Sequence, residues 1–225
     1  MALLRKLFAV LLLPFAVVAI WVLLKIIIEL GISNSSALSP FAAGLILYLL
    51  LQKLLSKPLR TYVFGHELTH AIAGILSGAK VKSFNVSSSG GCVVMDKRTP
   101  FIALAPYFVP IYTLIFAAIY LLVGLFIDTQ NYYWFYAFGC GFTLAFHYAL
   151  TYFALAKGQS DLKQYGKFFS ITIIVFALCI ATLMVLKAVF PYQIYIGNFI
   201  SQNIVDIKNI GQKVYALCLT FRLMK

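Results

Sequence analysis

Residues 61–78 read TYVFGHELTHAIAGILSG, an apolar segment that carries His66, Glu67 and His70 within five positions. The whole chain of 225 residues has three His and six Asp plus Glu, so this grouping is a strong motif. An unpaired charge at the centre of a membrane helix costs about 2.5–3.5 kcal/mol. A metal ion bound at the motif would supply the partner charge that Glu67 otherwise lacks.

The H-E-x-x-H spacing of these residues indicates a zinc site on an α-helix. Positions i and i+4 lie on one helix face, so His66 and His70 can direct imidazole nitrogens at one ion. Glu67 lies about 100° around the helix, near the ion but poorly aimed to ligate it. Zinc lowers the pKa of a bound water, and Glu67 can accept the proton as general base. The motif therefore predicts a zinc metallopeptidase with Glu67 as its catalytic residue.

A zinc site of this kind needs a third protein ligand. No Glu follows Glu67, and Ala73 and Leu76 stand where the longer motif H-E-x-x-H-x-x-G-x-x-H has Gly and His. We predict Asp161 as the third metal ligand, because a carboxylate at a helix end can reach into a bundle. His147, deep in an apolar segment, is the alternative ligand, an oxyanion hydrogen-bond donor or a structural polar contact. The other candidates are Glu29, Asp96, Asp128 and Asp206, of which Asp96 and Asp128 read as surface carboxylates.

The composition is that of a polytopic membrane protein. The chain is 63% hydrophobic and 11% charged, which is too apolar for a soluble domain of this length. Its net charge is +12, and the basic residues flank apolar segments, which fits contact with lipid headgroups and argues against nucleic acid. Arg5 and Lys6 favour a cytoplasmic N-terminus. The four cysteines form no CxxC pair and indicate no redox compartment.

The apolar segments predict an all-α polytopic fold of roughly five or six transmembrane or partial helices, in one membrane-embedded metalloprotease domain over 1–225. Residues 31–40 and 157–167 read as polar connectors, and Gly78 as the C-cap of the HExxH helix. Pro106 and Pro110 predict a kink or break. The expected elements are a first membrane helix at 7–30, a second helix at 41–57, the HExxH helix at 61–78, a membrane-associated β-hairpin near 80–98, membrane spans at 101–127, 132–156 and 168–190, and an amphipathic tail at 191–225.

The stretch GHELTHAIAGILSGAKVKSF at 65–84 resembles the first signature of the site-2 protease family of intramembrane zinc metalloproteases. The shared elements are HExxH on a membrane helix, small residues after it, and a G-x-K-V-x-x-F-like strand. The resemblance is to the small bacterial membrane metallopeptidases without a PDZ domain, and it implies a multi-pass protein of a bacterial cell membrane. It covers residues 61–110 well and 140–170 loosely.

By this resemblance His66 and His70 bind Zn²⁺, Glu67 is the general base, and the third ligand is an aspartate that usually stands in an L-D-G motif. This chain has Ser160-Asp161-Leu162 instead, with Gly166 five residues after the aspartate. The departure concerns the third ligand and leaves the two histidines unaffected.

Together these features predict an intramembrane zinc metalloprotease that acts on membrane proteins or peptides, without nucleic acid as a partner. The sequence does not indicate the substrate or the oligomeric state. The hairpin at 80–98 would either bind substrate as an added strand or serve as a plain connector. The alternative function is a catalytically inactive membrane scaffold that holds metal and binds membrane segments. A transporter is disfavoured because internal repeats are lacking.

Overall fold

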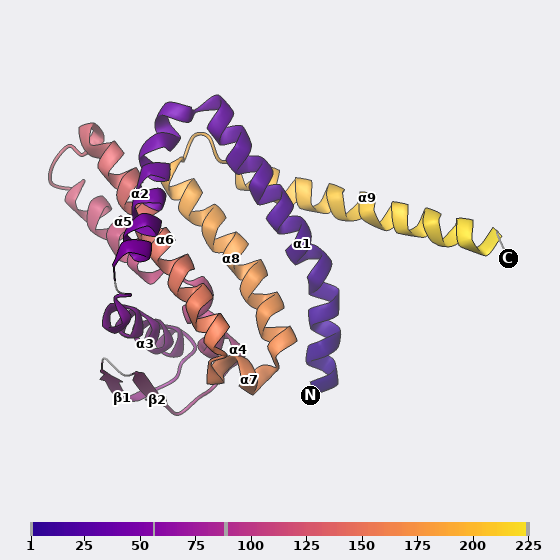
Figure 1. Ribbon diagram of the computed structural model, residues 1–225, viewed down its shortest axis with the longest axis horizontal. Helices are drawn as coiled ribbons and strands as arrows, with labels where there is room; N and C mark the ends of the chain where they lie inside the picture. The colour runs from indigo at the N-terminus through magenta and orange to yellow at the C-terminus, as the bar shows by residue number, and fades with distance from the viewer. Residues whose placement is uncertain (1, 56, 88–89, 224–225) are drawn as a thin grey trace.

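The computed structural model describes residues 2–55, 57–87 and 90–223 as a helical bundle with a small antiparallel sheet at one end (Figure 1). This confirms the predicted all-α membrane fold with a β-hairpin. The helices are α1 (Ala2–Ser33), α2 (Ser35–Leu54), α3 (Leu59–Leu76), α4 (Pro100–Phe108), α5 (Ile111–Val123), α6 (Tyr133–Lys157), α7 (Ser160–Tyr165), α8 (Lys167–Val189) and α9 (Ile196–Leu223). A 3₁₀ turn (Gln130–Tyr132) precedes α6, and the strands are β1 (Val81–Val86) and β2 (Gly91–Met95).

Four helices of the described chain are long and apolar enough to span a membrane, namely α1, α2, α6 with its preceding turn, and α8. A fifth span is formed if α4 and α5 are taken together, although these two helices meet at 70°. The break falls at Val109, whose backbone is extended because the next residue is Pro110. The segment expected at 101–127 is therefore a bent pair of helices.

The main core lies between α1, α2, α6 and α8, with Val22, Phe41 and Leu186 among its buried side chains. Helices α2 and α6 approach most closely at two glycines. A Cβ at Gly44 would lie 2.1 Å from the Phe138 carbonyl oxygen, and one at Gly141 would lie 2.0 Å from the Phe41 carbonyl oxygen. Small residues permit such close backbone packing in lipid. We expect the α2–α6 pair to be a rigid support for the site.

The connector expected at 31–40 is wrong, because only Asn34 lies outside helix between α1 and α2. Pro40 lies inside α2 and offers no N–H to the Ser36 carbonyl four residues earlier. The Ser39 hydroxyl donates to that carbonyl instead, at 3.0 Å. This side-chain bond replaces the missing helical one and explains why a stretch with loop-like composition stays helical.

The connector expected at 157–167 contains the short helix α7. Two left-handed glycines, Gly158 with φ +68° and Gly166 with φ +96°, stand on either side of it. Leu162 and Tyr165 turn inward and are 3% and 9% exposed. Burial of these two side chains holds α7 against the bundle, although most of its residues are polar.

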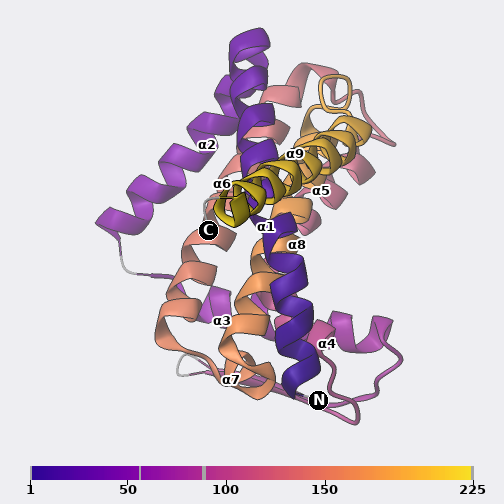
Figure 2. The same cartoon turned by 90° about the vertical axis from the view of Figure 1, so that its right-hand side faces the viewer.

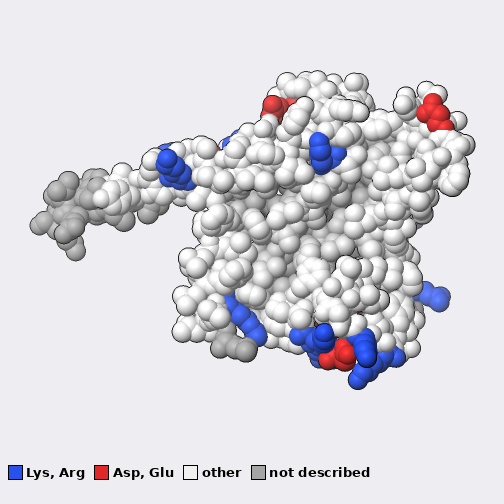
Figure 3. Space-filling view, turned by 180° about the vertical axis from the view of Figure 1, so that it is seen from behind, with Lys and Arg blue, Asp and Glu red and all other residues white. Residues whose placement is uncertain are grey.

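The N-terminus, the β-sheet and α7 lie at the same end of the bundle (Figure 2). Lys and Arg side chains gather at this end (Figure 3). Along the sequence positive residues border almost every loop, but the fold brings nine of the 18 Lys and Arg residues to this one end. By the positive-inside rule we expect this end to face the cytoplasm, which agrees with the expectation from Arg5 and Lys6. The elements at this end carry Arg5, Lys6, Lys80, Lys82, Lys97, Arg98, Lys157, Lys163 and Lys167.

The exposed thiol of Cys92, at the start of β2, provides a test of this orientation. In a Cys218→Ser background we expect a membrane-impermeant maleimide to label Cys92 only after intact cells are permeabilised. The control is Asp128→Cys with Cys92→Ser, in the loop at the opposite end, which should be labelled in intact cells. The reverse pattern would contradict the orientation.

Candidate metal and catalytic site

Helix α3 carries the HExxH motif and ends where the β-sheet begins. The backbone N–H of Gly78 donates to the Ile75 carbonyl at 2.9 Å, and that of Ala79 donates to the Gly74 carbonyl at 2.8 Å. Gly78 itself is left-handed, with φ +70°, which confirms the predicted C-cap. The tight turn after α3 directs the chain straight into β1, so the motif and the sheet are held side by side.

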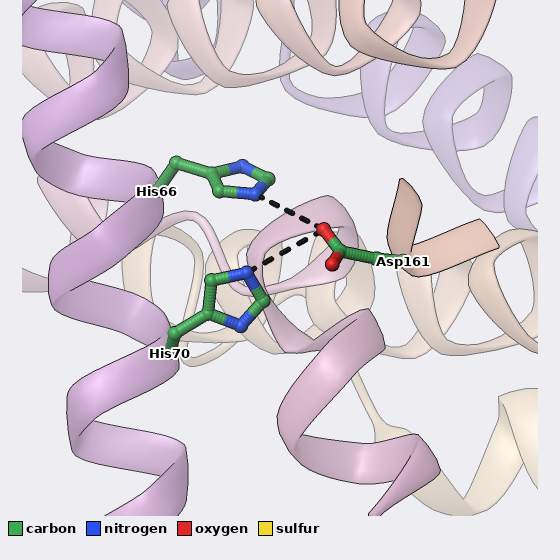
Figure 4. Close-up of side chains that lie close together, drawn as sticks. All are labelled: His66, His70 and Asp161. Atoms are coloured by element: carbon green, nitrogen blue, oxygen red, sulfur yellow. Dashed lines mark ion pairs between the residues drawn. The ribbon is translucent and has the colours of Figure 1, made fainter. Parts of the chain in front are cut away.

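The structure brings His66 and His70 of α3 together with Asp161 of α7 (Figure 4). Each histidine Nε2 lies 3.6 Å from Oδ2 of Asp161. One ligand atom from each of the three residues lies within 4.8 Å of the others, so the group could hold a metal ion. The side chains of His66, His70 and Asp161 are 8%, 12% and 24% exposed, so the group is largely shielded from solvent.

The hydrogen bonds of the two imidazoles suit a metal site. Nδ1 of His70 lies 2.7 Å from the Ile102 carbonyl oxygen, which can only accept, so Nδ1 carries the proton and Nε2 presents a lone pair. Nδ1 of His66 lies 3.2 Å from the Tyr62 hydroxyl, which leaves its Nε2 facing Asp161 as well. Outer partners of this kind orient metal-binding histidines. Two imidazoles and one carboxylate are a donor set that zinc accepts.

Asp161 is held by contacts on both sides. The Tyr107 hydroxyl donates to Oδ2 of Asp161 at 3.2 Å, and the neighbouring Leu162 packs in a buried cluster that includes Tyr107. Although burial favours the neutral acid, the nearby imidazoles of His66 and His70 hold the pKa of Asp161 well below its usual range. The side chain is therefore a carboxylate anion whose Oδ2 faces Nε2 of both histidines, as a third metal ligand would.

Glu67 lies buried between α3 and β2 and borders a cavity of about 540 Å³ shared with the three candidate ligands. The backbone N–H of Val93 in β2 donates to its carboxylate. A Cβ at Gly91 would lie 2.4 Å from Cγ of Glu67 and 2.8 Å from Cγ1 of Val63. The absence of a side chain at Gly91 lets β2 approach α3 closely enough to position Glu67 beside the candidate metal ligands.

Gly91→Val tests this positioning. The new side chain would displace Glu67, and a displacement of about 1 Å can cost about 10²-fold in rate. We expect a loss of peptide cleavage of that order with unchanged zinc content. Gly90→Val is the matched control, because a Cβ at Gly90 meets no atom within 4 Å. Equal activity of the two variants would contradict the role of Gly91.

Residues 40–124 match the family model described as Peptidase M50B-like. The match confirms the resemblance to the site-2 proteases over the segment that contains the HExxH helix, the β-sheet, α4 and α5. The four or five candidate spans indicate a multi-pass membrane protein, and the matched segment is similar to metallopeptidases of the M50B-like type. No curated protein and no solved structure matches the chain significantly. Asp161 and His147 lie beyond the M50B-like segment.

The structure places His147 outside the group formed by His66, His70 and Asp161. It borders a chamber of about 20 Å³ that Tyr62 and His66 also line, on the side of His66 that faces Tyr62. Its Nε2 is buried and has no hydrogen-bond partner among the described residues. A chamber of this size has room for one water. The geometry favours Asp161 over His147 as third ligand.

Three partners of the candidate ligands were not found by sequence reasoning, namely Tyr62, Tyr107 and the Ile102 carbonyl. Tyr62 stands four residues before His66 and hence on the same helix face, a signal that the sequence does contain. Tyr107 and Ile102 reach the site only because α4 packs against α3. No local pattern could have identified them.

Proposed function

We propose that this protein is an intramembrane zinc metalloprotease that hydrolyses peptide bonds of membrane proteins. The observation that carries the proposal is the convergence of His66, His70 and Asp161 beside the buried Glu67. The M50B-like match over the same helix supports a peptidase function. A metal site with a purely structural role would not need a carboxylate beside the cavity, whereas Glu67 lines it.

Zinc held by His66, His70 and Asp161 would act as a Lewis acid that acidifies a water and polarises a peptide carbonyl. Glu67 accepts the proton of the attacking water and returns it to the leaving amine. Tyr62 and the Ile102 carbonyl orient the two imidazoles through Nδ1. The Tyr107 hydroxyl orients Asp161 by donating a hydrogen bond to its Oδ2.

The β-sheet gives a means of presenting the substrate. β2 pairs with β1 along one edge, while Gly91, Cys92 and Val93 line the cavity. An extended substrate segment that adds to the other edge of β2, the one not paired with β1, exposes its peptide bonds to the site, whereas a helical segment hides them. The proposed substrate is therefore a membrane segment that unwinds locally beside β2.

The test compares protein fragments in membranes from cells that express the wild type or Glu67→Gln at matched levels. We expect new N-termini within or beside membrane-spanning segments with the wild type only. Identical fragment patterns, with both proteins loaded with zinc, would contradict the protease and favour the scaffold that binds membrane segments without cutting them.

A further inference from the structure

Helix α9 extends away from the rest of the protein (Figures 1 and 2). Among the described side chains of α9, the packed ones lie at its beginning, with Phe199 6% and Asn203 9% exposed and Ile207 against the main core. The described side chains from Asn209 onward are exposed. A helix with so few contacts is marginal in water, because helical stability comes mostly from a packed apolar face. The projecting part of α9 therefore needs a partner.

Helix α9 leaves the bundle next to Lys25, the residue at which the apolar part of α1 ends. Residues 7–24 of α1 carry no charged side chain and rise about 27 Å, close to the thickness of a bilayer's hydrocarbon core. Lys25 follows, and its Nζ lies 2.9 Å from Oδ2 of Asp206 in α9. In α8, Lys167 and Lys187 enclose an uncharged stretch that rises about 29 Å. Both spans place α9 at the membrane interface.

The direction of α9 and the distribution of its side chains are those expected of a helix at the membrane interface. The helix runs across α1 and α8 rather than along them (Figures 1 and 2). Ile200, Ile207 and Ile210 repeat at helical spacing on one face, and Ile200 and Ile210 are 54% and 47% exposed. Lys208 and Lys213 lie off this face, where an ammonium group can reach anionic headgroups.

We propose that α9 lies flat in the headgroup layer, on the side of the membrane opposite the His66–His70–Asp161 site. The exposed isoleucines of this face, Ile200 and Ile210, contact acyl chains, and the lysines contact lipid phosphates. The ion pair between Lys25 and Asp206 fixes the depth at which α9 meets α1. The partner of this surface is the lipid bilayer itself.

The test uses the full chain with Cys92→Ser and Cys218→Ser, since Cys140 and Cys179 are buried and escape labelling. Single nitroxide labels replace each residue from 208 to 213, and the protein is reconstituted into phosphatidylcholine–phosphatidylglycerol vesicles. Collision with oxygen reports lipid, and collision with a water-soluble nickel chelate reports water.

We expect the oxygen-to-nickel collision ratio to vary with helical period, highest at the Ile210→Cys label and lowest at Gln212→Cys. If the labels at all positions from 208 to 213 collided frequently with the nickel chelate, this part of α9 would be surrounded by water, and the proposal would be overturned. Low collision with both reagents at 210, with spin–spin broadening, would show a second copy of the chain on this face and also overturn it. A label at Asp128→Cys, in the exposed α5–α6 loop, checks that the reconstituted protein reports water where expected.

Discussion

Glu67→Gln is expected to lower the rate of peptide cleavage by about 10²–10⁴-fold, the contribution typical of a general base. Gln has nearly the shape of Glu, and its amide oxygen can still accept the Val93 N–H that now reaches the carboxylate. It cannot take a proton from water. The measurement is kcat on a substrate found in the fragment comparison, together with zinc content, which should not change.

The matched control for this change is Glu29→Gln, the same substitution in α1. Glu29 lies beyond Lys25, toward the end of the bundle opposite the site. It should keep the wild-type rate. If Glu67→Gln also kept the wild-type rate, Glu67 would not be the base, and the scaffold function would become the better explanation.

Asp161→Ala is expected to weaken zinc binding by more than about 10²-fold. Loss of an outer hydrogen-bond partner of a metal ligand already costs about 10–100-fold in affinity, and Asp161 is proposed as a direct ligand. The variant would leave His66 and His70 without the carboxylate that both now face at 3.6 Å. Competition with a chromogenic chelator in detergent measures the affinity.

Asp161→Asn, which keeps the volume of the side chain, separates the loss of a ligand from the loss of packing in α7. Asp128→Ala, an exposed aspartate at the other end of the bundle, should bind zinc as the wild type does. Unchanged affinity in Asp161→Ala with lost binding in His147→Ala would move the third ligand to α6.

Three of the four candidate site residues could be predicted from local sequence alone, because His66, Glu67 and His70 stand on one helix. The distance between His66 and His70 follows from helix geometry alone, and Glu67 is fixed relative to both. The third metal ligand depends on the contacts of α7; the sequence predicted Asp161, with His147 as the alternative. What brings Asp161 to the histidines is the burial of Leu162 and the packing of α4, neither of which a one-dimensional pattern contains.

The fold shows the same difference between features fixed by local sequence and features fixed by tertiary packing. Apolar length predicted the membrane helices, and the pre-proline position of Val109 accounts for the break between α4 and α5. The polar composition of 31–40 and 157–167 predicted connectors, but both stretches contain helix. In 31–40 the Ser39 hydroxyl bonds to the Ser36 carbonyl, and in 157–167 the buried Leu162 and Tyr165 hold α7 in place. Positive residues border almost every loop of the sequence, so the expected orientation rested on Arg5 and Lys6 alone. The fold strengthens that expectation because it gathers basic residues at the same end (Figure 3).

Zinc K-edge X-ray absorption of the purified wild-type protein tests most directly whether His66, His70 and Asp161 form a zinc site. We expect about one zinc per chain, with nitrogen and oxygen neighbours near 2.0–2.2 Å and the outer-shell scattering of about two imidazoles. A protein that takes up no zinc, or a sulfur shell near 2.3 Å, which would mean ligation by Cys92 at the cavity wall, would contradict the proposed centre.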